Sequence, residues 1–257
     1  GLTAIVTDFG TIENTVAGIV NNTGDNGIGL LGINGSVVSN LGTITVGNGG
    51  AALYGINNLN PAVTTGDINL TNDGVINSIG TTAASYGVVA KNHSATSTVT
   101  LGGNSQINFG NNPGGVGVYT ENTTINNNGG TITLGTSGVG IQGVNSTLNL
   151  VGGTITSTAT GAKGVYSNQA FTNTGTTVNL TGDNSTGLFS AVSVANNGTV
   201  KVGDSLNPSS PSIAIYAPTV TNTGTVESGV NSIGIYSNGA TNVDLQSGST
   251  LSVGSGG

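Results

Sequence analysis

The sequence predicts an all-β fold, a right-handed parallel β-helix (β-solenoid) of about nine or ten coils with three short strands in each coil. Three observations predict it. A Thr-(Ile/Val) motif recurs along the 257 residues. Apolar and polar residues alternate with a period of two rather than 3.6. Clusters of Gly, Asn, Ser and Thr separate these short segments as turns. A single coil cannot bury its apolar side chains, so we expect successive coils to stack.

The first recurring element is a short strand that begins with Thr and a branched aliphatic residue, after a turn of the type Asn-x-Gly. Successive copies lie 22 to 32 residues apart. Three short strands in each repeat of this length, with no segment of 3.6-residue periodicity, are typical of a parallel β-solenoid. We assign one aliphatic residue of this strand to each coil: Ile12, Ile44, Ile76, Ile107, Ile132, Ile155, Val178, Val200, Val226 and Leu251.

The second element is a Gly or Ala followed by an aliphatic residue and often by an aromatic one. A third, looser strand precedes the next copy of the first. We assign the small residue of the second element to Gly29, Gly55, Gly87, Gly117, Gly140, Gly164, Gly187, Ala214 and Gly234. We assign the third strand to 68–70, 99–101, 148–150, 192–194 and 243–245.

This architecture gives a place to the abundant residues, which are 46 Gly, 39 Thr and 35 Asn. Gly supplies positive φ at the corners, and Asn tolerates that conformation and can hydrogen-bond along a stack. Thr suits the outward positions of strands. The core is a thin tube, so an apolar content of 35% is sufficient. We expect matching turn positions at Asn40, Asn72, Asn128, Asn197 and Asn222.

The chain is interpreted as one solenoid segment over residues 1–257, with longer coils over 1–115 and shorter coils over 116–257. We expect loops at 57–66, 92–97 and 111–115, and an interruption at 205–212, which contains Pro208 and Pro211. At one strand spacing per coil the rod is about 45 Å long. Neither end carries a polar cap, so we expect a fragment of a longer solenoid.

Charge and cysteine content exclude several functions. Three Lys, no Arg and a net charge of -7 argue against binding nucleic acid or an anionic membrane. The chain has no Cys, which excludes disulfides, thiol catalysis, zinc fingers and iron–sulfur clusters. No apolar run approaches the roughly 18 residues of a membrane-spanning helix, so we expect no membrane insertion by this segment. We expect no metal and no cofactor.

The segment 203–206 reads Gly-Asp-Ser-Leu and resembles the serine box of one hydrolase family. A serine nucleophile needs a base, and the only histidine, His93, lies about five coils away, roughly 25 Å along the rod. Asp183 and Asp204 are the best stacked carboxylates, and we interpret both as solvated turn residues. We therefore expect no catalytic residue. The enzymatic alternative is a polysaccharide lyase or hydrolase, which requires converging carboxylates.

The aromatic residues form a more informative pattern, because they directly follow the aliphatic residue of the second element. That position should point outward, so stacked coils would align the rings in one column, with Gln142 in one coil. The functional interpretation is a binding stripe for a sugar or a protein, and the alternative is a structural ladder or burial under a loop. The column comprises Tyr119, Tyr166, Phe189, Tyr216 and Tyr236, whereas Tyr54 and Tyr86 are placed outside it.

Threonine provides a different surface. Thr-x-Thr pairs occur at 43/45, 131/133 and 154/156, a pattern typical of ice-binding solenoids. Lys201 and Glu227 interrupt these pairs in later coils. Ice binding and self-association between rods therefore remain alternatives.

The sequences of the repeats resemble those of a known family. Asn-Thr-Gly-Thr-Val at 222–226, Asn-Ser-Ile-Gly-Ile-Tyr-Ser-Asn at 231–238 and Gly-Val-Gly-Val-Tyr at 115–119 are similar to passenger repeats of fusobacterial autotransporter adhesins, which are type V secreted outer-membrane proteins. The resemblance implies a β-helical stalk or passenger on a Gram-negative cell surface, held there by a C-terminal barrel that this chain does not contain. It implies attachment to a protein or glycan on host cells or other bacteria, and it places no site residue.

Overall fold

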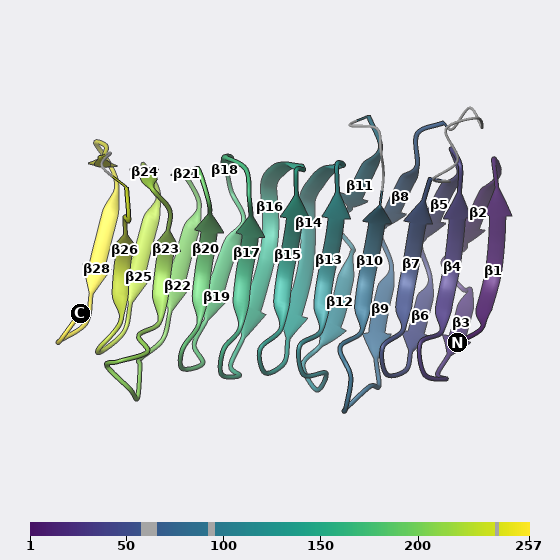
Figure 1. Cartoon of the computed structure of the whole chain (residues 1–257), viewed down its shortest axis with the longest axis horizontal. Helices are drawn as coiled ribbons and strands as arrows, with labels where there is room; N and C mark the ends of the chain where they lie inside the picture. Colours follow the sequence, from purple (N-terminus) through teal and green to yellow (C-terminus); the bar gives the residue numbers. More distant parts are fainter. Residues whose placement is uncertain (58–65, 92–95, 240–241) are drawn as a thin grey trace.

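The computed structural model confirms the all-β fold. It describes residues 1–57, 66–91, 96–239 and 242–257, which form 28 strands and no helix. The strands are parallel and stack as a β-solenoid of about nine turns. Figure 1 shows the strands side by side along a rod whose two chain termini lie at opposite ends. In this part of the chain there is no helix of the length and apolarity needed to cross a bilayer.

Three ladders of parallel strands run the length of the rod, and each coil adds one strand to each ladder. The second and third ladders merge into one sheet at β14 and β16, which turn from one ladder into the other through bulges. The first ladder comprises β1 (Thr3–Asp8), β4 (Ile28–Ile33), β7 (Ala51–Ile56), β10 (Tyr86–Lys91), β13 (Val116–Glu121), β15 (Val139–Val144), β17 (Lys163–Ser167), β20 (Thr186–Ser190), β23 (Ile213–Tyr216) and β26 (Ile233–Tyr236). The second comprises β2 (Thr11–Asn14), β5 (Val37–Asn40), β8 (Asn69–Asn72), β11 (Thr98–Leu101), the first parts of β14 (Thr124–Leu134) and β16 (Thr147–Ser157), β18 (Phe171–Asn173), β21 (Ser193–Asn196), β24 (Thr219–Asn222) and β27 (Val243–Leu245). The third comprises β3 (Ile19–Asn22), β6 (Thr43–Val46), β9 (Val75–Ser78), β12 (Gln106–Phe109), the second parts of β14 and β16, β19 (Thr177–Leu180), β22 (Thr199–Val202), β25 (Thr225–Ser228) and β28 (Thr250–Val253).

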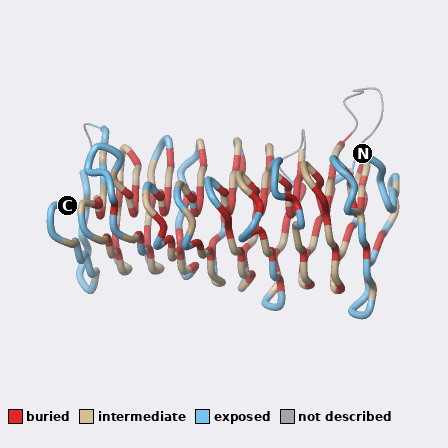
Figure 2. Tube along the Cα trace, turned by 90° about the horizontal axis from the view of Figure 1, so that it is seen from below, coloured by how far each residue is buried: buried red, intermediate tan, exposed pale blue. Residues whose placement is uncertain are grey.

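The core is a tube formed by columns of aliphatic side chains, and buried residues recur in the successive coils between the two ends of the rod (Figure 2). The predicted first column is correct from Ile44 to Leu251, but its first member is wrong. Ile12 pairs with Val38 in the second ladder, and Val20 pairs with Ile44. The first coil has two inward branched residues, Ile12 and Val20, and the Thr-Ile motif indicates Ile12, which is the wrong one.

The small-residue column also needs one correction. A Cβ at Gly117 would lie 2.6 Å from the carbonyl oxygen of Gly140 and 2.7 Å from Ile132 Cγ2, so the backbone at Gly117 has no room for a side chain unless its neighbours move. In β7 this position belongs to Ala52 and not to Gly55, because Leu53 is the residue paired with Leu30. The sequence motif matched Gly55 because an aliphatic residue also follows it.

A left-handed residue forms the corner between the third and first ladders in most coils. This corner explains part of the Gly and Asn content, because these residue types enter the left-handed region most easily. Backbone N–H groups of the corner bond to the next coil, as from Gly161 to the Asp183 carbonyl at 2.8 Å. The left-handed residues, with φ between 53° and 77°, are Asn26, Gly49, Gly114, Ser137, Gly161, Asn184, Asn231 and Gly256.

A buried asparagine ladder runs along the corner between the second and third ladders. Asn196 is fully buried, accepts a hydrogen bond from Asn173 Nδ2 at 2.9 Å and donates one to Asn222 Oδ1 at 2.8 Å. The predicted members Asn40, Asn72 and Asn222 are confirmed, whereas Asn128 and Asn197 are wrong by one residue. The asparagines at this position are Asn14, Asn40, Asn72, Asn127, Asn173, Asn196 and Asn222. Leu101 of β11 and Leu150 of β16 interrupt the ladder on either side of Asn127.

The predicted interruptions are only partly within the described chain. Pro208 and Pro211 lie in the irregular segment between β22 and β23, as expected, and 111–115 is a turn between β12 and β13. The expected loops at 57–66 and 92–97 fall largely on residues 58–65 and 92–95, which lie outside the described residues.

We predict that Asn196→Ala lowers the free energy of unfolding by about 2–4 kcal/mol, because it leaves buried amide groups of Asn173 and Asn222 without their ladder partner. The measurement is denaturant unfolding followed by circular dichroism. The control is Asn197→Ala, since Asn197 is exposed. Equal effects of the two substitutions would show that the ladder does not stabilise the rod.

Candidate functional site

The predicted aromatic column exists on the outer face of the first ladder. Tyr166, Phe189, Tyr216 and Tyr236 occupy equivalent positions of β17, β20, β23 and β26. Their ring centroids are 4.4, 5.1 and 5.0 Å apart, with interplanar angles of 5°, 19° and 23°. The strand spacing of about 4.8 Å imposes this stacking. The first three rings are partly exposed and Tyr236 is 42% exposed, so one edge of the stack faces solvent.

Tyr119 belongs to the same column but does not stack on the four rings. Gln142 of β15 lies between Tyr119 and Tyr166. Tyr119 instead meets the edge of Tyr86 at a centroid distance of 6.4 Å and an interplanar angle of 77°. The structure therefore places all five predicted residues in one column and separates one of them from the stack.

The placement of Tyr54 outside the column is wrong. Tyr54 pairs with Val89, which in turn pairs with Tyr119, so Tyr54 is a member. The Gly-aliphatic motif at Gly55 predicts a register of β7 that differs from the observed one, in which Ala52 holds the small-residue position. Tyr86 does lie outside the column, since it pairs with Ala51 and Val116 in the neighbouring outward position.

A hollow that the sequence did not predict interrupts this face, and we call it the tyrosine hollow. It is a cavity of about 480 Å³ lined by three tyrosines, small and aliphatic residues, and a few polar side chains. Val89, only 3% exposed, occupies the column position where a ring would otherwise stand between Tyr54 and Tyr119. In the sequence, the sign of this hollow is that Val89 replaces an aromatic residue in the column. This replacement is visible only when Tyr54 is placed in the same column. The lining residues are Asn26, Gly27, Ile28, Gly49, Ala51, Tyr54, Tyr86, Val89, Lys91, Tyr119 and Gln142.

The charges beside the tyrosine hollow are balanced. Lys91 Nζ lies 3.7 Å from Glu121 Oε1 and 5.5 Å from the centre of the Tyr119 ring. The Tyr119 hydroxyl donates a hydrogen bond to Glu121 Oε1. Burial, followed by this hydrogen bond and the negative charge of Glu121, raises the pKa of Tyr119 from 10.0 to about 12. Tyr119 therefore remains a neutral hydroxyl donor at physiological pH.

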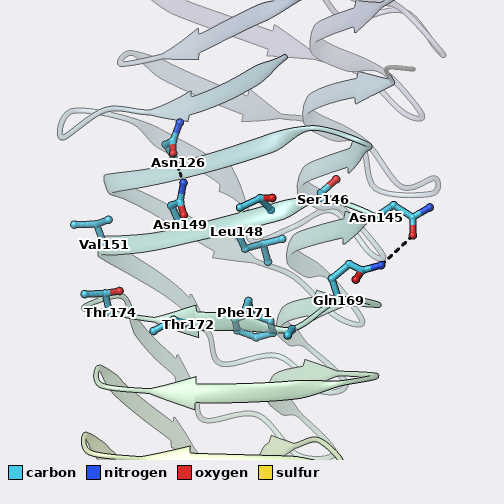
Figure 3. Close-up of a pocket in the computed structure, with 12 residues that line it drawn as sticks. Asn126, Asn145, Ser146, Leu148, Asn149, Val151, Gln169, Phe171, Thr172 and Thr174 are labelled. Carbon is cyan, nitrogen blue, oxygen red and sulfur yellow. Dashed lines mark hydrogen bonds between the residues drawn. The ribbon is translucent and has the colours of Figure 1, made fainter. Parts of the chain in front are cut away.

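A second depression lies on the outer face of the second ladder (Figure 3). It has a volume of about 680 Å³, carries no charged residue in its lining, and has Phe171 at its base, 6% exposed. Its amides bond to one another: Asn149 donates to Asn126 at 2.8 Å, and Gln169 donates to Asn145 at 3.3 Å. A shallower depression of about 270 Å³ continues it over β18, β21 and β24. These amides can hydrogen-bond hydroxyl groups but offer no open aromatic face.

The threonine pairs lie on the outer face of the third ladder. The column that contains the first threonine of the pairs at 131/133 and 154/156 continues beyond these pairs, because threonines occupy it in six successive coils. The adjacent column changes from Thr133 and Thr156 to Asn179, Lys201 and Glu227, and the last two form an ion pair at 3.1 Å. The threonine column comprises Thr131, Thr154, Thr177, Thr199, Thr225 and Thr250.

The serine of the Gly-Asp-Ser-Leu segment occupies a structural position. Ser205 is 2% exposed, and its Oγ lies 3.1 Å from Asp183 Oδ1 and 3.0 Å from the carbonyl oxygen of Asn207. Asp204 accepts the backbone N–H of Val230 at 2.7 Å. Both carboxylates therefore hold turns. His93 lies outside the described residues, among which no cluster of three or more His, Asp or Glu side chains could hold a metal ion.

Comparison with known proteins found no matching family model, and no match among curated proteins or solved structures.

We predict that one of the six tyrosines titrates about two pH units above the usual pKa of 10.0, and that Tyr119→Phe removes this late step. Because the folded-state pKa is raised, the stabilisation from neutral Tyr119 is complete below pH 10 and is lost as the pH rises to about 12. The measurement is the absorbance of tyrosinate during an alkaline titration.

Glu121→Gln should lower the pKa of Tyr119 without returning it to 10.0, since burial remains the largest cause. Glu227→Gln, on another face, is the matched control and should leave the titration unchanged. A titration curve of Glu121→Gln identical to that of the unmodified chain would contradict the assignment.

Proposed function

We propose that this chain is a non-enzymatic adhesin or stalk segment, which attaches the cell that carries it to host cells or to other bacteria. The observation that carries the proposal is the aromatic column, a row of partly exposed rings displayed along one face of a rod. Aromatic rings provide large contact areas at low cost in side-chain entropy, and they are enriched where proteins bind partners.

The proposed mechanism is attachment through many modest contacts. Backbone hydrogen bonds between coils keep the rod stiff, so the rings of successive coils remain aligned for one extended partner. Several weak contacts made at once give a much stronger attachment than each contact alone. The scarcity of charge, 5% of residues, leaves little electrostatic repulsion to oppose approach.

The proposed setting is the surface of a Gram-negative cell, as a passenger segment of a type V autotransporter. The support is the resemblance of the repeat sequences at 115–119, 222–226 and 231–238 to the repeats of adhesin passengers. The proposed partner is a surface protein or glycan. The function is proposed as non-enzymatic because Ser205, Asp183 and Asp204 already have structural roles in the turns.

The test is a cell-binding and coaggregation assay with the purified chain. The variant Tyr166→Leu/Phe189→Leu/Tyr216→Leu removes three stacked rings and should weaken attachment at least about tenfold. Leucine suits these positions, because Leu31 occupies the same column in β4. The matched control is Thr177→Ala/Thr199→Ala/Thr225→Ala on the threonine column, which should bind as well as the unmodified chain.

Two outcomes would contradict the proposal. One is an absence of attachment to any host or bacterial cell by the folded, unmodified chain. The other is cleavage of a polysaccharide by the chain that Asp183→Asn abolishes, which would support the enzymatic alternative instead.

A further inference from the structure

We propose that the tyrosine hollow binds a single neutral pyranose residue of a glycan. This inference rests on the proposed function and names the ligand class of one subsite. The hollow lies where the aromatic column is interrupted. Its lining is centred on β7 and β10 and extends from Ile28 of β4 to Gln142 of β15, so it differs from the stacked rings of β17 to β26.

The shape of the hollow follows from two small residues. Ala51 and Val89 occupy outward positions in adjacent columns of the first ladder, and they are 6% and 3% exposed. Bulkier neighbours surround them: Tyr54 and Tyr119 flank Val89 along one column, and Tyr86 follows Ala51 along the other. The volume of about 480 Å³ falls in the range typical of small-molecule sites, about 300–1,000 Å³.

The chemistry of the lining matches a sugar ring. A pyranose has an apolar face of C–H groups and an edge of hydroxyl groups. The rings of Tyr54, Tyr86 and Tyr119 supply apolar surface for the face. Lys91 and Gln142 at the same site supply hydrogen-bond donors and acceptors for the edge. Apolar walls with a small number of polar groups are what a small-molecule site requires.

The charges favour a neutral ligand. Lys91 is already paired with Glu121 at 3.7 Å, so an acidic sugar would have to compete with Glu121 for it. The net charge of -7 also opposes the approach of anions. A quaternary ammonium group would suit a cage of aromatic rings, but here it would meet Lys91, whose ammonium lies 5.5 Å from the centre of the Tyr119 ring.

The state of Tyr119 is consistent with this role. Its raised pKa keeps the hydroxyl protonated across the physiological range, and its hydrogen bond to Glu121 holds the side chain in place. The edge-to-face contact with Tyr86 holds the second ring. The walls are therefore ordered before a ligand arrives, which reduces the entropy lost on binding.

The decisive variant fills the hollow without removing any polar group. Ala51→Leu places a larger side chain on its floor, and the column tolerates such a residue, because Ile28 precedes it and Val116 follows Tyr86. The control is Val139→Leu, a smaller enlargement to the same residue type in the same column outside the hollow. Both variants should unfold at nearly the temperature of the unmodified chain.

The probes are the methyl pyranosides of glucose, galactose and mannose, with glucuronate and choline as charged comparisons. Binding is followed by chemical-shift changes in the ring resonances of the tyrosines. The expected result is saturable binding of at least one neutral pyranoside, with shifts at Tyr54, Tyr86 and Tyr119. Ala51→Leu should weaken this binding about tenfold or more, and Val139→Leu should leave it unchanged.

Three results would overturn the inference: no pyranoside binds, Ala51→Leu binds as tightly as the unmodified chain, or glucuronate or choline binds more tightly than every neutral sugar. The cell-binding assay distinguishes this failure from failure of the proposed function. Attachment by the unmodified chain without pyranoside binding would contradict sugar binding by the hollow but not the proposed adhesin function. Pyranoside binding without attachment to any cell would contradict the adhesin function but not sugar binding by the hollow.

Discussion

The parallel hydrogen bonding between successive coils is the constraint on which the other features of this structure depend. Each strand bonds to the strands one coil before and after it, so equivalent residues lie about one strand spacing apart. An inward column can then stay apolar, or its residues can hydrogen-bond to the equivalent residues of the neighbouring coils. The fully buried Ile107, Ile132 and Ile155 follow the first rule, and Asn173, Asn196 and Asn222 follow the second. Side chains in the outward positions are free to vary.

The outward columns carry the proposed function. Where consecutive coils present aromatic residues, the register makes them stack, as from Tyr166 to Tyr236. Where one coil presents a small residue among larger ones, as at Ala51 and Val89, the same register leaves a hollow. The proposed contact stripe and the proposed sugar site thus arise from one architecture. They differ only in which side chains occupy equivalent positions.

Periodicity was sufficient to predict the fold class, the three strands per coil and most of the aromatic column, because these features repeat. Errors arose where a coil departs from the repeat. The sequence favours Ile12 over Val20 because Thr11-Ile12 matches the repeat motif although both residues are inward and branched. It favours Gly55 because Ala52 replaces the usual glycine. The doublet Asn196-Asn197 does not show which amide faces inward until the strand pairing is known. The tyrosine hollow depends on neighbouring residues from five strands of the first ladder, β4 to β15, and no linear motif encodes it.

The most direct test of the account is the detection of scalar couplings across backbone hydrogen bonds by nuclear magnetic resonance, which identifies each donor and its acceptor. The stacked register predicts couplings from the amide of Lys163 to the carbonyl of Gly138, from Thr186 to Ala162, and from Ile213 to Ser185. Each of these pairs joins one coil to the preceding coil. Couplings that connect these amides to residues of their own coil, or to residues one position out of register, would contradict the stacked columns and the sites built on them.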